Sequence, residues 1–385
     1  MKKAVLILGM ALTGLTMCGQ QALWGVPMFK APEVNADRTV TFRFLAPQAD
    51  TVYIDGDFQS PERPLMTKDE KGLWCYTTPE PLAPELYSYA FNVDGLRMPD
   101  PANVYQIRDV ATVTNVFLVP GEQADYYRVA DVPHGTVSKV WYHSPKIGND
   151  RRMTIYTPAG DETSPRRSPV LYLLHGMGGD ENAWSELGRA TQILDNMIAA
   201  GEVEPMIVVM PNGNVDMQAA PGETSIGFEP PTIALPRTMD GTFEEAFPEI
   251  VAFTDSIYRT LPDKANRAIA GLSMGGFHSF QISKEYPQMF DYVGLFSSAF
   301  NRGKDSGSPV YSDVDNKLAR QFATAPRLYW IGIGKEDFLY KDNQAFTDKL
   351  DAAGYPYQYY ESPGGHIWRN WRVYLTRFLP QLFKH

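Results

Sequence analysis

This 385-residue sequence has very few cysteines and no cluster of basic residues. It contains only Cys18 and Cys75, and because Cys18 lies beside a predicted export signal, removal of that signal would leave one cysteine and no internal disulfide. The formal net charge is −10, and Lys and Arg form no dense run. A protein that neutralises nucleic-acid phosphates needs basic patches, so we expect no nucleic-acid partner.

Histidine is also scarce, with six residues scattered along the chain. No His-x-x-x-His pair occurs, and such paired spacing is typical of metal sites on helices. The sequence also lacks a glycine-rich phosphate loop of the Walker or dinucleotide-binding type. We therefore expect neither a metal nor a cofactor.

An apolar run at the N-terminus is too short to span a bilayer comfortably. It extends from Ala4 to Met17 and follows the basic start Met1-Lys2-Lys3. The run predicts a signal peptide over residues 1–19, without a clear cleavage site, and a periplasmic or extracellular protein with no transmembrane segment in its mature form. Cys18 raises the alternative of a lipoprotein, which Met17 directly before it makes the weaker interpretation.

Residues 24–120 have the pattern of an all-β domain. Short stretches of alternating apolar and polar residues are typical of half-buried strands. They occur at 39–44, 51–54, 73–77, 87–93 and 111–119. Asp55-Gly56 and Asp94-Gly95 fit tight hairpin turns, because Asp and Gly tolerate positive φ. With no helical period in view, we expect a β-sandwich of immunoglobulin-like size.

The pattern changes after a polar segment at residues 120–125, which is expected to form a hinge. Buried apolar runs occur at 170–174, 206–210, 267–270, 292–296, 328–333 and 357–360, and helical stretches at 191–200, 243–258, 274–285 and 343–352. Strands buried on both faces, with helices between them, indicate a mostly parallel sheet covered by helices. Residues 121–385 are therefore expected to form an α/β domain.

One pentapeptide carries the strongest chemical signal. Gly271-Leu272-Ser273-Met274-Gly275 follows an apolar strand and opens a predicted helix. Its glycines permit a sharp turn that lifts the serine oxygen clear of the sheet, and the helix start offers backbone N–H groups where negative charge develops. A tight turn with a solvent-facing serine is the alternative, but the strand-turn-helix setting favours Ser273 as a nucleophile.

A serine nucleophile of this type is followed in the chain by an acid and then by a histidine. Only His366 and the terminal His385 lie far beyond Ser273, and a chain end is poorly suited to positioning a catalytic group. His366, in a glycine-rich turn, is the predicted base. Asp337 follows the strand that ends near residue 333, at the sheet edge that carries active sites, and is the predicted acid, with Glu336 as the open alternative.

An oxyanion hole of this type needs two backbone donors. The N–H of Met274, directly after the nucleophile, is the first predicted donor. The segment His175-Gly176-Met177-Gly178-Gly179 follows the strand ending at residue 174, and its glycines allow the backbone to approach a substrate closely, so Met177 is the second. We interpret His175 as structural and His278 as packed rather than catalytic.

The sequence resembles carbohydrate esterase family 1, which contains feruloyl esterases, acetylxylan esterases and esterase D-like relatives. The residues that carry the resemblance are Tyr172-Leu173-Leu174-His175-Gly176, Gly271 to Gly276, Gly334 to Asp337, and Gly364-Gly365-His366 with Trp368. The resemblance implies an α/β-hydrolase fold and the same triad of Ser273, Asp337 and His366.

Residues 24–120 in turn resemble a family 48 carbohydrate-binding module, an early-set sandwich. The matching residues are Gly72-Leu73-Trp74, Tyr87-Ser88-Tyr89-Ala90-Phe91, Val93-Asp94-Gly95 and Asp100-Pro101-Ala102-Asn103. The resemblance implies a module that either binds glycan or only supports the catalytic domain.

These motifs do not define the acyl group. The long connection at residues 212–242 is either a surface insertion or a pocket wall, and its apolar residues would suit a planar hydroxycinnamoyl group. Trp184, Phe228 and Trp368 are candidate substrate-binding residues. We expect a feruloyl esterase that acts on feruloylated xylan through an acyl-enzyme. The alternatives are an acetylxylan esterase, whose substrate is acetylated xylan, then a siderophore esterase or an inactive glycan-binding scaffold.

Overall fold

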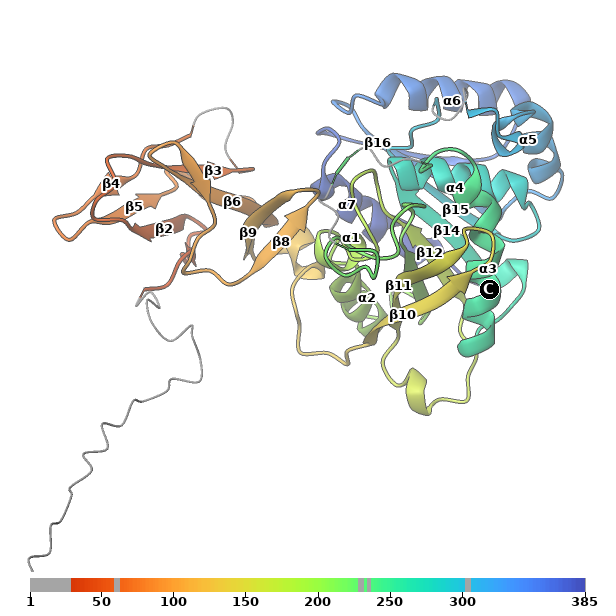
Figure 1. Cartoon of the computed structure of the whole chain (residues 1–385), viewed down its shortest axis with the longest axis horizontal. Coiled ribbons are helices and arrows are strands. Elements are labelled where there is room, and N and C mark those ends of the chain that lie inside the picture. Colours follow the sequence, from red (N-terminus) through yellow and green to blue (C-terminus); the bar gives the residue numbers. More distant parts are fainter. Residues whose placement is uncertain (1–28, 59–62, 228–231, 234–236, 302–305, 385) are drawn as a thin grey trace, which may run out of the picture.

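The computed structural model describes residues 29–58, 63–227, 232–233, 237–301 and 306–384 (Figure 1). The predicted signal peptide with Cys18, and the candidate Phe228, lie outside the described residues. Figure 1 shows an all-β part, in red to orange, beside an α/β part, in yellow to blue. Among the helices of the described ranges, none has both the length and the apolar character that crossing a membrane requires.

The all-β part is a sandwich of two antiparallel sheets. One sheet has the order β1-β2-β5-β4, and the other has β3-β6-β9-β8 with β7 beside β6. The strands are β1 (Glu33–Val34), β2 (Val40–Leu45), β3 (Val52–Gly56), β4 (Thr67–Lys68), β5 (Leu73–Thr77), β6 (Glu85–Val93), β7 (Leu96–Met98), β8 (Gln106–Asp109) and β9 (Thr112–Val119). Alternate side chains of both sheets meet in an aromatic core that includes Phe42, Tyr89, Phe91 and Phe117.

The two predicted hairpin turns of the sandwich have different outcomes. Asp94 and Gly95 take φ values of 49° and 90° and join β6 to β7, as predicted. The prediction for Asp55 and Gly56 is wrong, because both residues belong to β3, where Gly56 pairs with Tyr89 of β6. The dipeptide therefore ends the strand, and the chain has doubled back by Leu65, which forms an antiparallel bridge with Tyr53.

The α/β part contains an eight-stranded sheet with the order β10-β11-β13-β12-β14-β15-β16-β17. It is parallel from β13 to β17 and antiparallel at the β10–β11 edge, a hairpin that the sequence pattern does not reveal. Its strands are β10 (Thr136–Ser144), β11 (Asn149–Thr157), β12 (Val170–Leu174), β13 (Ile207–Pro211), β14 (Arg267–Leu272), β15 (Tyr292–Phe296), β16 (Leu328–Gly334) and β17 (Gln358–Ser362). The predicted α/β fold is confirmed.

Helices cover both faces of this sheet. Side chains of α1, α2 and α7 pack on one face, and side chains of α3 to α6 pack on the other. The helices are α1 (Ala183–Glu186), α2 (Ala190–Ala199), α3 (Thr242–Ile257), α4 (Met274–Glu285), α5 (Val314–Ala323), α6 (Tyr340–Ala353) and α7 (Trp368–Phe378). Strands β12 to β16 are thus buried on both faces, which explains why they are continuous apolar runs.

The sandwich and the α/β part are packed tightly together. Leu86, Ile107 and Val116 of the sandwich belong to the same buried cluster as residues of α2 and α7. The expected hinge at residues 120–125 is not a loose linker, because the chain forms a 3-10 turn over Glu122–Tyr126 and buries Tyr127 completely. Apolar packing therefore fixes the two parts against each other.

A buried ion pair also crosses this interface. The Arg372 guanidinium, on α7, donates to a Glu85 carboxylate oxygen at 3.0 Å and to the Leu86 carbonyl at 3.1 Å. A further hydrogen bond runs to the Leu187 carbonyl at 3.0 Å. Both charged side chains are 6% exposed, so the pair needs its mutual compensation, and Arg369 lies 3.7 Å from the other Glu85 carboxylate oxygen.

Candidate active site

Ser273 lies on a strained turn between β14 and α4. Its backbone has φ 54° and ψ −112°, and its N–H donates to the Phe296 carbonyl at 2.8 Å. A methyl group added to Gly271 would lie 2.4 Å from the Gly275 carbonyl carbon, and one added to Gly275 would lie 2.3 Å from the Leu174 carbonyl oxygen. The two glycines are therefore required for the close backbone approach that presents the serine.

Asp337 and His366 are brought together at the carboxyl edge of the sheet. Asp337 follows β16, His366 lies between β17 and α7, and the imidazole Nδ1 is 2.9 and 3.1 Å from the two Asp337 carboxylate oxygens. The Leu339 N–H donates to the same carboxylate at 2.9 Å. Burial alone would raise the pKa of Asp337, but the hydrogen bonds from His366 and Leu339 lower it. The neighbouring Glu336 is exposed, and the partner of His366 is Asp337.

Aromatic rings hold the His366 imidazole on two sides. The Phe338 ring lies 4.5 Å from it and the Trp371 ring 4.8 Å away in an edge-to-face arrangement. The Trp371 indole N–H donates to the Ser297 hydroxyl at 3.1 Å, and that hydroxyl also lowers the pKa of Asp337. No sequence motif marks Trp371, whereas Ser297 directly follows β15 at the same sheet edge and was not predicted.

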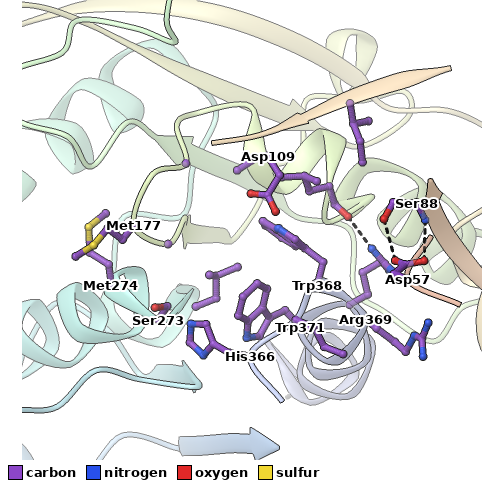
Figure 2. Close-up of a pocket in the computed structure, with 18 of the residues that line it drawn as sticks. Asp57, Ser88, Asp109, Met177, Ser273, Met274, His366, Trp368, Arg369 and Trp371 are labelled. Atoms are coloured by element: carbon purple, nitrogen blue, oxygen red, sulfur yellow. Dashed lines mark hydrogen bonds between the residues drawn. The ribbon is translucent and has the colours of Figure 1, made fainter. Parts of the chain in front are cut away.

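A glycine-rich loop, residues 175–180, follows β12 and approaches the serine. A methyl group added to Gly176 would lie 2.4 Å from Leu272 Cδ1 and 3.4 Å from Ser273 Cβ, so the backbone passes close to the turn. Met177 and Met274 lie at the same end of the cavity as Ser273 (Figure 2). The structure thus brings both predicted oxyanion-hole residues to the predicted nucleophile.

His175 links the glycine-rich loop to the loop after β13. The Gly213 N–H donates to Nε2 at 2.8 Å, so Nδ1 carries the ring proton and donates to the Gly176 carbonyl at 2.7 Å. Burial lowers the pKa of His175 to about 4, which keeps the ring neutral at pH 7. His278 is 1% exposed and its Nδ1 lies 2.7 Å from the Glu244 carboxylate. Neither ring lines the cavity, so both are packed residues.

Both parts of the molecule line one cavity of about 570 Å³. The α/β wall, the lining residues that follow residue 120, includes Met177, Ser273 and His366. The sandwich wall is formed by Asp57, Leu86, Tyr87, Ser88, Ile107, Asp109, Thr114 and Val116. Figure 2 shows Ser273 and His366 at one end and Asp57 with Ser88 at the other, with Trp368 and Trp371 between them. No local sequence motif signals the sandwich wall, so it was not predicted.

The sandwich end of the cavity is polar. The Asp57 carboxylate accepts hydrogen bonds from the backbone N–H and the hydroxyl of Ser88, each at 3.0 Å. Partial desolvation by the surrounding cavity walls raises the pKa of Asp57 despite these bonds and also raises that of Asp109, although both side chains keep exposed surface. The Arg369 guanidinium stacks over the Tyr87 ring at 5.2 Å. A ligand that extended from Ser273 toward the sandwich would therefore meet polar donors and acceptors.

The substrate-binding candidates are placed differently. Trp368 lines the cavity, whereas Trp184 is 1% exposed and donates its indole N–H to the Leu174 carbonyl. Trp184 is thus a core residue, and the prediction that it contacts the substrate is wrong. Ile233 and Met239, from the long 212–242 connection, line the cavity. Across the residues described here, no three His, Cys, Asp or Glu side chains form a group that could hold a metal ion.

Comparison with known proteins identifies relatives of both parts. The family model named Esterase matches residues 144–382. An endo-1,4-beta-xylanase/feruloyl esterase of Xylanibacter ruminicola is 29% identical over 92% of this chain and 46% of its own length. The chain spans about half the length of the curated relatives it matches first, 46% of one and 56% of the other.

Solved structures show the same fold. A ferulic acid esterase is 27% identical, with a TM-score of 0.51 over 64% of this chain and 97% of its own. The enterobactin esterase of Shigella flexneri is 16% identical, with a TM-score of 0.60 over 90% of this chain and 93% of its own. The second likeness extends the shared fold across the sandwich as well as the α/β part.

Proposed function

The chain belongs to the Esterase family, and we propose that it is a serine esterase that releases hydroxycinnamoyl groups such as ferulate from plant cell-wall xylan. The esterase expected from the sequence is confirmed by the family match. The observation that carries the mechanism is the placement of Ser273 and His366 in one cavity, with the Asp337 carboxylate bonded to His366 behind it.

The proposed chemistry follows from this geometry. Because Nδ1 of His366 binds Asp337, Nε2 takes the Ser273 hydroxyl proton as Oγ attacks the ester carbonyl carbon. Backbone N–H groups of Met177 and Met274 stabilise the resulting oxyanion. Collapse of the tetrahedral intermediate breaks the ester C–O bond, and the imidazolium protonates the leaving alcohol. Water then attacks the acyl-enzyme by the same route and frees the acid and Ser273.

An aromatic acyl group fits the apolar residues at the catalytic end. Met177, Ile233, Phe338 and Ile367 line the cavity and are exposed. Exposed apolar side chains that converge on a reactive group favour an apolar ligand. The names of the Xylanibacter ruminicola relative and of the 27% identical structure support a feruloyl substrate. An acetylxylan esterase is the second candidate, because an acetyl group would use the same triad.

The polar sandwich wall suits the carbohydrate side of the ester. Asp57, Ser88 and Asp109 offer carboxylates and a hydroxyl to sugar hydroxyl groups, and we propose that the sandwich is a family 48-like module that contacts the polysaccharide. An enzyme that acts on such a polymer must meet it outside the cytoplasm. We therefore propose that residues 1–19 direct export to the periplasm or the medium, which fractionation of expressing cells would test.

Release of ferulate from methyl ferulate and feruloylated xylan, compared with release of acetate from acetylated xylan, tests the acyl specificity. Ferulate release should dominate, and its absence would overturn the feruloyl proposal. Ser273→Ala should lower kcat by roughly 10⁴- to 10⁶-fold with folding retained. Ser283→Ala, on a serine buried at the far end of α4, is the control for a substitution that leaves the turn intact.

A further inference from the structure

The β8–β9 hairpin of the sandwich contacts the glycine-rich loop directly. Arg108, near the end of β8, donates from Nη2 to the Asp180 carboxylate and from Nη1 to the Val110 carbonyl at 2.6 Å. Asp180 is 3% exposed and belongs to the loop that contains Met177. One guanidinium therefore ties the hairpin turn of one part to the catalytic loop of the other.

Val110, at the tip of this hairpin, makes the second contact. Its φ is 52°, a conformation that a β-branched residue adopts only under strain and that glycine adopts freely. A methyl group added to Gly178 would lie 2.7 Å from Val110 Cγ2, so the valine side chain occupies the space beside this glycine. Strained residues that surrounding contacts hold in place are typical of functional sites. The strained residue Val110 thus lies where its side chain contacts the glycine-rich loop.

The same loop is held from its other side by the α/β part. The Asn214 side chain donates to the Gly179 carbonyl at 2.8 Å, and His175 bonds Gly176 and Gly213. The Asp180 carboxylate additionally accepts the Asn182 N–H at 2.9 Å. The loop thus lies between an inner set of bonds from its own sheet and an outer clamp of Arg108 and Val110.

We propose that Arg108 and Val110 are positioning residues that hold the Met177 backbone where the oxyanion forms. The sandwich then acts in the ester chemistry itself, even on substrates with no sugar to bind. This inference rests on the proposed esterase function. A role of the sandwich in polymer binding alone would leave small esters unaffected, whereas a displaced oxyanion-hole donor slows the turnover of every ester.

Arg108→Ala, Arg108→Lys and Val110→Gly test the clamp on methyl ferulate and p-nitrophenyl acetate. The matched control is Arg43→Ala, because Arg43 lies on the other sheet of the sandwich and its side chain is 25% exposed, against 27% for Arg108. Like Arg108, it pairs with a carboxylate, that of Glu33 at 2.8 Å. We expect Arg108→Ala to lower kcat about 10- to 100-fold with little change in KM. The kcat of Arg108→Lys should lie between those of Arg108→Ala and wild type, because one ammonium group cannot bind both Asp180 and Val110 as the guanidinium does.

Val110→Gly separates positioning from folding. Glycine accepts the positive φ, so thermal stability should be equal or higher while kcat falls about 10-fold. Affinity for a boronic acid that forms a tetrahedral adduct on Ser273 should fall in parallel with kcat/KM, and binding of the product ferulate should stay unchanged.

Two results would overturn the proposal: kcat within twofold of wild type in both Arg108→Ala and Val110→Gly, or equal losses in boronic acid and ferulate affinity. A wild-type protein that hydrolyses no ester would instead reject the proposed function.

Discussion

The catalytic residues of the α/β part lie just after strands, whereas the sandwich wall of the cavity is made by residues that reach it only through domain docking. Ser273 and Asp337 lie within three residues of β14 and β16. Asp57 and Asp109 face the cavity because Leu86, Ile107 and Val116 pack against α2 and α7. One site therefore combines catalytic residues positioned by a local turn with cavity-lining residues positioned by the interface between two domains.

The two walls also differ in their chemistry. The α/β wall holds the reactive groups and exposed apolar side chains, and the sandwich wall holds carboxylates whose pKa partial desolvation raises. Substitutions of the reactive groups in the first wall should therefore change kcat. Substitutions of the buried Arg372–Glu85 pair at the interface should change stability and the coupling between the two parts.

After Ser273 itself, the largest expected effect is at the acid of the triad. Asp337→Asn keeps the size of the side chain but removes the charge that orients the imidazole, and should lower kcat by roughly 10⁴-fold. Glu336→Gln, one residue earlier and exposed, should leave kcat within a few fold. Steady-state kinetics on methyl ferulate would measure both, and a larger loss in Glu336→Gln would reassign the acid.

The interface should show the next largest effect. Arg372→Ala leaves the buried Glu85 carboxylate with only the longer contact from Arg369, at 3.7 Å, and should lower the free energy of unfolding by roughly 3 kcal/mol. Urea unfolding should then show the sandwich and the α/β part separating into two transitions. Arg377→Ala, on an exposed residue of the same helix that stacks over Tyr360, should cost under about 1 kcal/mol. A single unchanged transition in Arg372→Ala would show that apolar packing alone couples the parts.

A smaller effect of pH is expected at His175. The folded protein protonates this ring only below about pH 4, whereas the unfolded chain does so below about 6.5. Between these values the unfolded state binds more protons, so the free energy of unfolding falls as the pH falls from 6.5 to 4, by at most about 3 kcal/mol. In His175→Gln the free energy of unfolding should depend less on pH over this range. His143→Gln, on an exposed histidine, is the control and should keep the wild-type dependence.

Trp368 should show the smallest effect. Its ring lies between the two ends of the cavity, so Trp368→Ala should raise KM for methyl ferulate about fivefold, equivalent to roughly 1 kcal/mol. KM for p-nitrophenyl acetate should change little, because an acetyl group has no ring to pack. Trp141→Ala, on an exposed indole of β10, serves as the control. Equal KM changes for both esters would mean that Trp368 does not contact the acyl group.

The sequence predicts the α/β wall better than the sandwich wall for a physical reason. Strand-turn-helix order and buried apolar runs are local, so the places of Ser273, Asp337 and His366 follow from chain order and strand position. Ser297 could have been found by the same rule, because it directly follows a buried strand. The contact of Val110 with Gly178 depends on how two domains dock, which no local pattern encodes.

Short or exposed elements are also missed. Strands β1, β4, β7 and β8 have two to four residues, too few for a period of two to be visible. Most side chains of β10 are exposed or half-buried, so its pattern is weak. For Trp184 the error is the opposite, because a substrate contact was predicted and the structure has a core residue. An indole can satisfy its N–H inside a core as well as in a pocket.

The pairing of Glu85 with Arg372 has a consequence for synthesis. The two residues are 287 positions apart, which corresponds to roughly 15 to 60 s of translation at common rates. The sandwich closes its own aromatic core from residues 34–119, so it can fold long before α7 is made. Throughout that interval Leu86 and Val116 lack their α7 neighbours. We expect the nascent sandwich to present this apolar face to chaperones until the C-terminal helix covers it and completes the catalytic cavity.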